Sequence, residues 1–212
     1  MASPIRACFF GDSFVNGVGD ATGRGWVGRV ASLARAEGID LTTYNLGVRR
    51  DTSADILSRW QSEAAARLPS DAAGRLCFAF GTNDCSDGGA GAPRVAADDA
   101  LANAKAILLM AMATAPTIML GPLPALEDPA TDERIAAYDG KLASLCRDLR
   151  VPYLPCFEAM RSNAEWKEGA ARGDGTHPGT AGYERLAWYV WDWMPFRTWL
   201  NATRTLGVSP GR

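Results

Sequence analysis

The sequence contains a single histidine, His177, in a polar, glycine-containing segment that begins at Asp174. An imidazole that activates a serine hydroxyl needs a hydrogen-bond acceptor on its second ring nitrogen, which fixes its tautomer and orientation. A carboxylate three residues earlier in the same loop can provide that acceptor. Ser13 directly follows an apolar run and Gly11-Asp12, so it is a candidate nucleophile. These residue types predict acyl transfer through a serine.

Acyl transfer also requires hydrogen-bond donors directed at the developing oxyanion. Three candidate donors follow three separate apolar runs: the Ser13 N–H, the Gly47 N–H and the side-chain amide of Asn83. Taken alone, each residue also has a structural interpretation, because serine caps helices, asparagine forms turns and glycine opens tight connections. The catalytic interpretation depends on their occurring together.

Short apolar runs alternate along the chain with alanine-rich segments of helical period, a pattern typical of βαβ units around a parallel sheet. We expect strands at Ile5–Phe10, Leu41–Asn45, Leu76–Phe80, Thr117–Leu120 and Val151–Pro155. We expect helices near Gly25–Glu37, Thr52–Arg67, Arg94–Ala113 and Asp132–Leu149, and after Pro178. No repeat or linker divides residues 1–212, so the sequence predicts one domain with a three-layer α/β/α sandwich. The carboxyl ends of its parallel strands would bring the candidate residues to one edge.

Four short motifs in this order resemble those of the SGNH hydrolases, also called GDSL esterases and lipases. They are Gly11-Asp12-Ser13, Gly47, Gly81-Thr82-Asn83-Asp84 and Asp174-Gly175-Thr176-His177-Pro178. The resemblance implies a flavodoxin-like five-stranded parallel sheet of order 2-1-3-4-5 and a Ser13–His177–Asp174 triad. It also implies an oxyanion hole formed by Ser13, Gly47 and Asn83.

Two positions depart from the family pattern. Phe14 stands where the family name places leucine, a change at the helix entry that should leave the Ser13 hydroxyl unaffected. Arg49-Arg50 stands where many members have a second glycine. The two arginines either recognise an acidic group on the substrate or form a salt bridge to Asp51 or Asp55, and the salt bridge is the interpretation we prefer.

The leading hypothesis is a serine esterase that cleaves carboxylic esters through an acyl-enzyme on Ser13. The same residues would serve an acyltransferase or a thioesterase, and a non-catalytic flavodoxin-like binding module is the alternative from another class. The substrate would be a small-molecule ester, and we expect no cofactor and no metal, because the single histidine belongs to the triad and the cysteines lack ligand spacing.

Three segments near the expected site or the chain end have competing interpretations. Gly17–Gly23 lacks the spacing of a phosphate-binding loop and is interpreted as a flexible loop bordering the catalytic crevice. The glycine-rich segment 86–92 is expected to be a mobile rim. The aromatic residues near the C-terminus predict a helix packed on the sheet, with a homo-oligomer interface or an acyl-binding wall as alternatives; they are Tyr183, Trp188, Tyr189, Trp191, Trp193, Phe196 and Trp199.

Composition and charge exclude several functional classes. The formal net charge of −2 gives no positive field to attract nucleic acid or an anionic membrane. The five cysteines are an odd number without zinc-site spacing, which favours reduced thiols. The apolar run after the N-terminus is broken at Gly11-Asp12, too early for a signal-peptide core or membrane span. These features predict a cytoplasmic protein.

Overall fold

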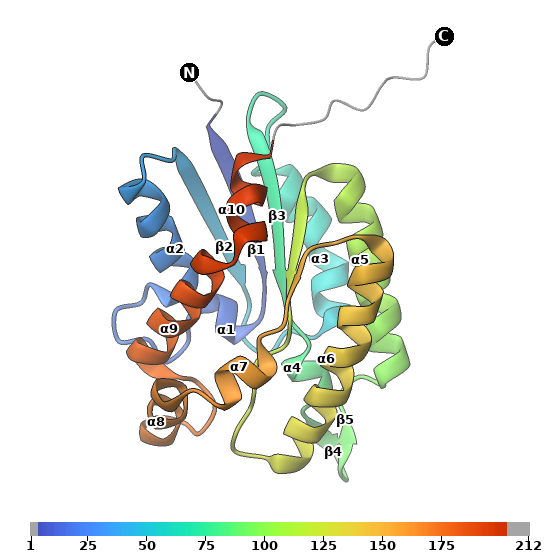
Figure 1. Ribbon diagram of the computed structural model, residues 1–212. Helices are drawn as coiled ribbons and strands as arrows, with labels where there is room; N and C mark the ends of the chain where they lie inside the picture. Colours follow the sequence, from blue (N-terminus) through green and yellow to red (C-terminus); the bar gives the residue numbers. More distant parts are fainter. Residues whose placement is uncertain (1–3, 203–212) are drawn as a thin grey trace.

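The computed structural model describes residues 4–202 and contains a five-stranded parallel sheet between two layers of helices (Figure 1). The order of its strands is β2-β1-β3-β6-β7, which is 2-1-3-4-5 when the strands of this sheet are counted along the chain. The predicted fold class and strand order are therefore confirmed. The strands are β1 (Ile5–Gly11), β2 (Leu41–Gly47), β3 (Ala73–Ala79), β6 (Thr117–Leu120) and β7 (Tyr153–Leu154).

Alternate side chains of the central strands enter the two hydrophobic layers, as the two-residue period of a strand requires. Phe9 and Cys77 pack in one layer with α2 (Gly25–Ala36), α8 (Ala164–Arg172), α9 (Gly179–Asp192) and α10 (Met194–Asn201). Phe10 and Phe78 pack in the other layer with α3 (Ser53–Ala65), α5 (Ala97–Thr114) and α6 (Pro129–Leu149). β1 is buried on both faces because a layer of helices covers each side of the sheet, which explains its continuous apolar run.

The five expected strands and the five expected helical segments all occur, with boundary shifts of a few residues. Two helices were not predicted from the sequence, α7 (Phe157–Arg161) and α8, which together fill the connection from β7 to the His177 segment. Segment 86–92, expected to be a mobile rim, contains a small antiparallel hairpin of β4 (Asp87–Gly89) and β5 (Ala92–Pro93). Its mobility stays a prediction.

The aromatic C-terminal segment packs on the sheet, as predicted. Trp199 makes an edge contact with Phe9 of β1, with ring centroids 6.0 Å apart, and Trp191 and Phe196 are buried. The helix is interrupted between α9 and α10, where Pro195 occupies the first turn of α10 and needs no intrahelical donor. All five cysteines are buried and free. None of the helices in residues 4–202 has both the length and the apolar character needed to cross a bilayer.

The parallel strands all end at the lower edge of the sheet in Figure 1, where two short helices follow them. α1 (Ser13–Asn16) follows β1, and α4 (Thr82–Cys85) follows β3. The last residues of β1, β2 and β3 are in register: Gly11 pairs with Gly47 and with Ala79. This alignment places the motifs that follow the three strands side by side.

Candidate active site

A cavity of about 490 Å³ opens at this edge of the sheet. Ser13, Asn83, Asp174 and His177 all line it, so the structure brings together four of the five residues that the sequence predicts for the site. Gly47 is not among the described residues that line the cavity. The other lining residues are Phe14, Arg49, Arg50, Thr82, Ser86, Asp87, Arg94, Ala125, Glu127, Asp128, Thr131 and Thr176.

The turn after β1 fixes the position of Ser13. A side chain at Gly11 is excluded, because a Cβ there would lie 2.1 Å from the carbonyl oxygen of Ala79 in β3. Asp12 caps α1, since its carboxylate accepts the N–H of Phe14 at 2.9 Å. Ser13 is thus the first residue of α1 and does not provide the cap. Neither its N–H nor its hydroxyl has a hydrogen-bond partner within residues 4–202, so both are available to a ligand in the cavity.

Asp174 and His177 form the predicted carboxylate–imidazole pair. Asp174 Oδ2 lies 2.6 Å from His177 Nδ1, while Oδ1 accepts the backbone N–H groups of His177 at 2.9 Å and Thr176 at 3.1 Å. Burial raises the pKa of Asp174, but the hydrogen bonds from His177 and Thr176 outweigh it and lower that pKa to about 2. The carboxylate is therefore ionised at neutral pH and holds the imidazole with a proton on Nδ1.

The other ring nitrogen of His177, Nε2, is buried and has no hydrogen-bond partner among residues 4–202. Unpaired buried nitrogens are costly and are found at functional sites. The Ser13–His177 hydrogen bond is not formed, although both side chains line the same cavity. Such bonds are often long in substrate-free enzymes and tighten on the way to the transition state.

The imidazole of His177 is enclosed by residues that the sequence analysis did not connect with it. The Phe14 ring lies against it with centroids 5.2 Å apart, so the residue that departs from the family name contacts the candidate base. A Cβ at Gly19 would lie 3.1 Å from His177 Cβ, so the glycine leaves room for the histidine. Segment 17–23 therefore packs against His177, but none of its residues is among the described residues that line the cavity, so its role as a flexible border of the crevice stays a prediction.

Asp20 connects that loop to the helix that follows His177. Its carboxylate accepts hydrogen bonds from Gly25 N–H, from Arg29 and, at 2.9 Å, from the hydroxyl of Thr180 in α9. Burial raises the pKa of Asp20, but hydrogen bonds led by that from Arg29 outweigh it and lower the pKa well below its ordinary value. No signal in the sequence indicated that Asp20, an aspartate in a glycine-rich segment, would bind a residue as distant as Thr180.

Asn83 lies at the start of α4, and its side-chain amide donates to the carbonyl of Asp51 at 3.0 Å and to Asp12 Oδ2 at 3.2 Å. Asp12 is 2% exposed, and its burial raises its pKa to about 7 despite the hydrogen bond from Phe14. The amide is thus held between the β2–α3 connection and the turn that carries Ser13. The role of Asp12 was missed, because the sequence analysis treated it only as part of the Gly11-Asp12-Ser13 motif.

The structure gives Gly47 a packing role and no place on the cavity. Its N–H donates to Asn45 Oδ1 at 3.1 Å, and a Cβ at this position would lie 2.2 Å from the backbone nitrogen of Asn16. Arg50 does line the cavity, has a left-handed backbone with φ of 73°, and its N–H has no partner within residues 4–202. The Gly47 N–H is thus bound to Asn45 in this structure, and its predicted role as an oxyanion donor stays a prediction.

The preferred interpretation of the two arginines, a salt bridge to Asp51 or Asp55, is wrong. Asp51 pairs with Arg59 at 2.7 Å, and Asp55 forms the capping box of α3 with Thr52. The nearest carboxylate oxygen to Arg49 belongs to Asp174, at 4.0 Å. Asp51 and Asp55 are thus bound by groups on α3 and at its N-terminus. Arg49 and Arg50 do not pair with them and instead line the cavity.

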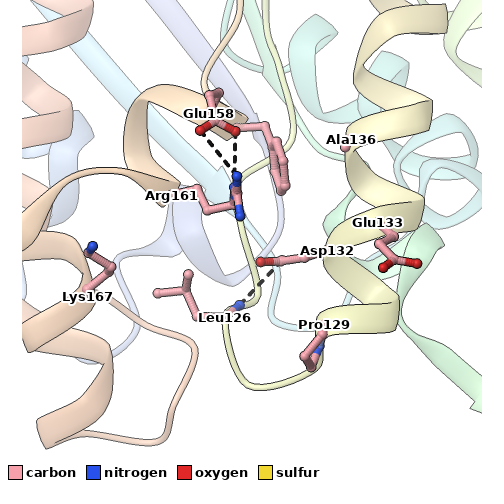
Figure 2. Close-up of a pocket in the computed structure, with 9 residues that line it drawn as sticks. Leu126, Pro129, Asp132, Glu133, Ala136, Glu158, Arg161 and Lys167 are labelled. Carbon is pink, nitrogen blue, oxygen red and sulfur yellow. Dashed lines mark hydrogen bonds and ion pairs between the residues drawn. The ribbon is translucent and has the colours of Figure 1, made fainter.

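A second cavity of about 570 Å³ is lined by residues of the segment before α6, of α6 itself, of α7 and of α8 (Figure 2). Glu158 and Arg161 pair there at 3.0 Å, and Asp132 accepts the backbone N–H of Ala125 at 2.8 Å. None of the described residues that line this cavity is a histidine, serine or cysteine. They therefore offer no nucleophile and no base of the kind found at the first cavity. The catalytic candidates therefore belong to the smaller cavity.

Comparisons with solved structures show that other proteins share this fold. The acetylxylan esterase Axe2 of Geobacillus stearothermophilus has a similar structure, with a TM-score of 0.73 and 19% identity over 95% of this chain and 96% of that chain. A lipolytic protein of the G-D-S-L family from Veillonella parvula DSM 2008 has a TM-score of 0.73 and 18% identity, over 90% of this chain and 98% of that chain. TesA has a TM-score of 0.72 and 25% identity, over 92% of this chain and 99% of that chain. No curated protein matches the sequence significantly.

The family assignment comes from the sequence itself. A family described as the GDSL-like lipase/acylhydrolase family matches residues 9–185, which is well over half of the chain and includes every motif that carries the resemblance. The chain is therefore a hydrolase that belongs to the GDSL-like lipase/acylhydrolase family.

Proposed function

We propose that this protein is a serine esterase that cleaves carboxylic esters through an acyl-enzyme on Ser13. The observation that carries the proposal is the Asp174–His177 pair: His177 Nε2 is buried, has no partner in the part of the chain that the structure describes, and lies beside a cavity that Ser13 also lines. With Nδ1–H donating to Asp174, Nε2 keeps a free electron pair, as a general base requires.

In the acylation step, His177 Nε2 takes the proton from Ser13 Oγ while Oγ bonds to the ester carbonyl carbon. The tetrahedral intermediate collapses when the C–O bond to the alcohol breaks, and the imidazolium returns the proton to the leaving oxygen. Asp174 stabilises the imidazolium between the two transfers. Water, activated by the same nitrogen, then releases the acid and restores Ser13.

The oxyanion donors we propose are the N–H of Ser13, the amide of Asn83 and, as a candidate added to Gly47, the N–H of Arg50. The N–H groups of Ser13 and Arg50 have no partner among residues 4–202, and both residues line the cavity. Asn83 has to yield its longer hydrogen bond, the 3.2 Å contact with Asp12, to the developing negative charge. That charge is a stronger acceptor in the transition state than the ester carbonyl in the ground state.

The cavity lining favours a short acyl group. Among the described residues that line it, Phe14 and Ala125 are the two with apolar side chains, and the others are polar or charged. A long acyl chain would find little apolar surface to cover it. The similarity to an acetylxylan esterase agrees with a small acyl group on a polar alcohol.

The proposal is tested by labelling with a fluorophosphonate and locating the modified peptide by mass spectrometry. We expect one adduct, on Ser13, and none in the Ser13→Ala variant. Hydrolysis of 4-nitrophenyl acetate should fall by several orders of magnitude in that variant while its melting temperature stays close to that of the wild type, since Asp12 provides the helix cap. Retained turnover in Ser13→Ala would overturn the assignment. Product analysis with added alcohol would reveal acyl transfer.

A further inference from the structure

Three arginines from two separate connections line the candidate active-site cavity. Arg49 and Arg50 lie between β2 and α3, and Arg94 follows the hairpin of β4 and β5. Arg94 Nη1 donates to the carbonyl oxygen of Arg50 at 2.8 Å, which ties the two connections together at the cavity. The arginines are therefore part of one local structure, although 44 residues separate Arg50 from Arg94.

These arginines differ from many others in the chain because they lack a close carboxylate partner. Arg29, Arg59 and Arg161 each have a carboxylate oxygen within 3.0 Å. Within residues 4–202, Arg50 and Arg94 form no ion pair. Arg49 is 62% exposed and lies 4.0 Å from the Asp174 oxygen that His177 already occupies. The guanidinium groups can therefore bind an anionic group from outside the protein.

Four acidic residues also line the cavity, and one of them, Asp174, lies 4.0 Å from Arg49 and is paired with His177. Glu127 and Asp128 precede α6, and Asp87 begins β4. Asp128 is already engaged by Thr131 and Arg134, at 2.6 and 3.7 Å. An anionic substrate group would be repelled by Glu127 and Asp87 and attracted by the arginines.

From this arrangement we infer that the preferred substrate is an ester that carries an anionic group, bound by the guanidinium groups of Arg49 and Arg50. The inference rests on the proposed esterase function and adds the class of substrate to it. Arg94 acts as a positioning residue, because its contact is with the Arg50 carbonyl.

The test uses pairs of esters that differ in one charge. One pair places the charge on the acyl side: 4-nitrophenyl monoadipate and its methyl ester. The other places it on the alcohol side: 4-acetoxybenzoate and its methyl ester. For each pair, the measured quantity is the ratio of kcat/KM for the anionic ester to kcat/KM for the neutral ester. Because intrinsic reactivity is the same with every enzyme, changes in this ratio between variants report recognition of the charge.

For at least one pair, we expect Arg49→Gln to lower the ratio by about 1.5- to 5-fold, the range for an exposed ion pair. Arg50→Gly should act in the same direction, and glycine adopts the left-handed backbone of residue 50 without strain. About 0.5 M salt should lower the wild-type ratio by screening the charges. Arg172→Gln is the matched control, because Arg172 is exposed on α8 and pairs with Glu168 away from the cavity.

The outcomes separate this inference from the proposed function. Ratios that neither arginine substitution changes, in either pair, would overturn the inference while hydrolysis of the neutral esters still supports an esterase. Hydrolysis of none of the four esters by the wild type would count against the esterase proposal itself. A reduced ratio in Arg172→Gln, equal to that in Arg49→Gln, would attribute the effect to overall charge and would also overturn the inference.

Discussion

Replacement of Asp174 by asparagine should reverse the tautomer of His177. Asp174 Oδ1 accepts two backbone N–H groups, those of Thr176 and His177, while Oδ2 faces Nδ1 at 2.6 Å. Asparagine has one side-chain oxygen, and the two N–H groups require it at the Oδ1 position. The amide NH₂ must then face Nδ1, which can accept its hydrogen bond only without a proton. The imidazole proton moves to Nε2.

A protonated Nε2 cannot take the Ser13 proton, and the carboxylate that stabilises the imidazolium is also lost. In serine proteases the corresponding change lowers kcat by about 10⁴ with the geometry intact. We expect a similar loss here, equivalent to about 5.5 kcal/mol in the activation free energy. The effect on stability should be small, because the side chain is 45% exposed and the asparagine keeps the two backbone hydrogen bonds.

Two measurements check this prediction. The first is kcat for 4-nitrophenyl acetate, with Asp148→Asn as control because Asp148 is an exposed carboxylate that pairs with Arg147 on α6. The second is the ¹⁵N NMR spectrum of the imidazole, which needs no assignment because the chain has one histidine. Activity of Asp174→Asn within tenfold of wild type, or a ring still protonated at Nδ1 and free at Nε2, would refute the reasoning.

Three further changes have defined outcomes. Asn83→Ala should lower kcat by about 10²–10³ with a smaller effect on KM, whereas a change confined to KM would assign Asn83 to substrate binding. Burial raises the pKa of Asp12 to about 7, so the folded state holds this proton more tightly than the unfolded state between about pH 4 and 7. The free energy of unfolding of the wild type minus that of Asp12→Asn should therefore fall as the pH rises across that window, by up to about 4 kcal/mol. A difference that does not change with pH in denaturant titrations would contradict this. Gly19→Ala should lower both the melting temperature and kcat, because residue 19 has a left-handed backbone and its Cβ would lie 3.1 Å from His177 Cβ and push that residue away. An unchanged kcat would show that catalysis does not depend on this position of His177.

The parts of the site that could be predicted from the sequence are those governed by local pattern. β1 is an unbroken apolar run that ends at Gly11, and the parallel topology that the alternating elements imply sends Ser13 and Asn83 to the same edge. The Asp174–His177 contact spans three residues within one loop, so its geometry needs little from the rest of the fold. Each of these inferences depends on short sequence separation or on the direction of a strand.

Long-range polar contacts could not be predicted in the same way. The hydrogen bond from Thr180 to Asp20 joins residues 160 positions apart, and that from Asn83 to Asp12 joins residues 71 apart. Both aspartates lie beside glycines, where a turn is a sufficient explanation for a short polar side chain. Burial decides their role, and the burial of a single polar residue depends on tertiary packing.

Gly47 was predicted from its place after an expected strand, and the structure adds Arg50 as a further candidate donor. Gly47 is the last residue of β2, so the direction of that strand brings it to the edge of the sheet that carries Ser13. At Gly47, however, close packing against Asn16 requires the missing side chain. The left-handed backbone at the cavity belongs to Arg50, where a non-glycine residue costs about 1–2 kcal/mol relative to the right-handed region. Glycine would avoid this cost, and strained backbone is retained where surrounding contacts or function require it. The hydrogen bond from Arg94 to the Arg50 carbonyl offsets part of the strain. A free N–H and a guanidinium at one cavity-lining residue give a functional reason for arginine at position 50.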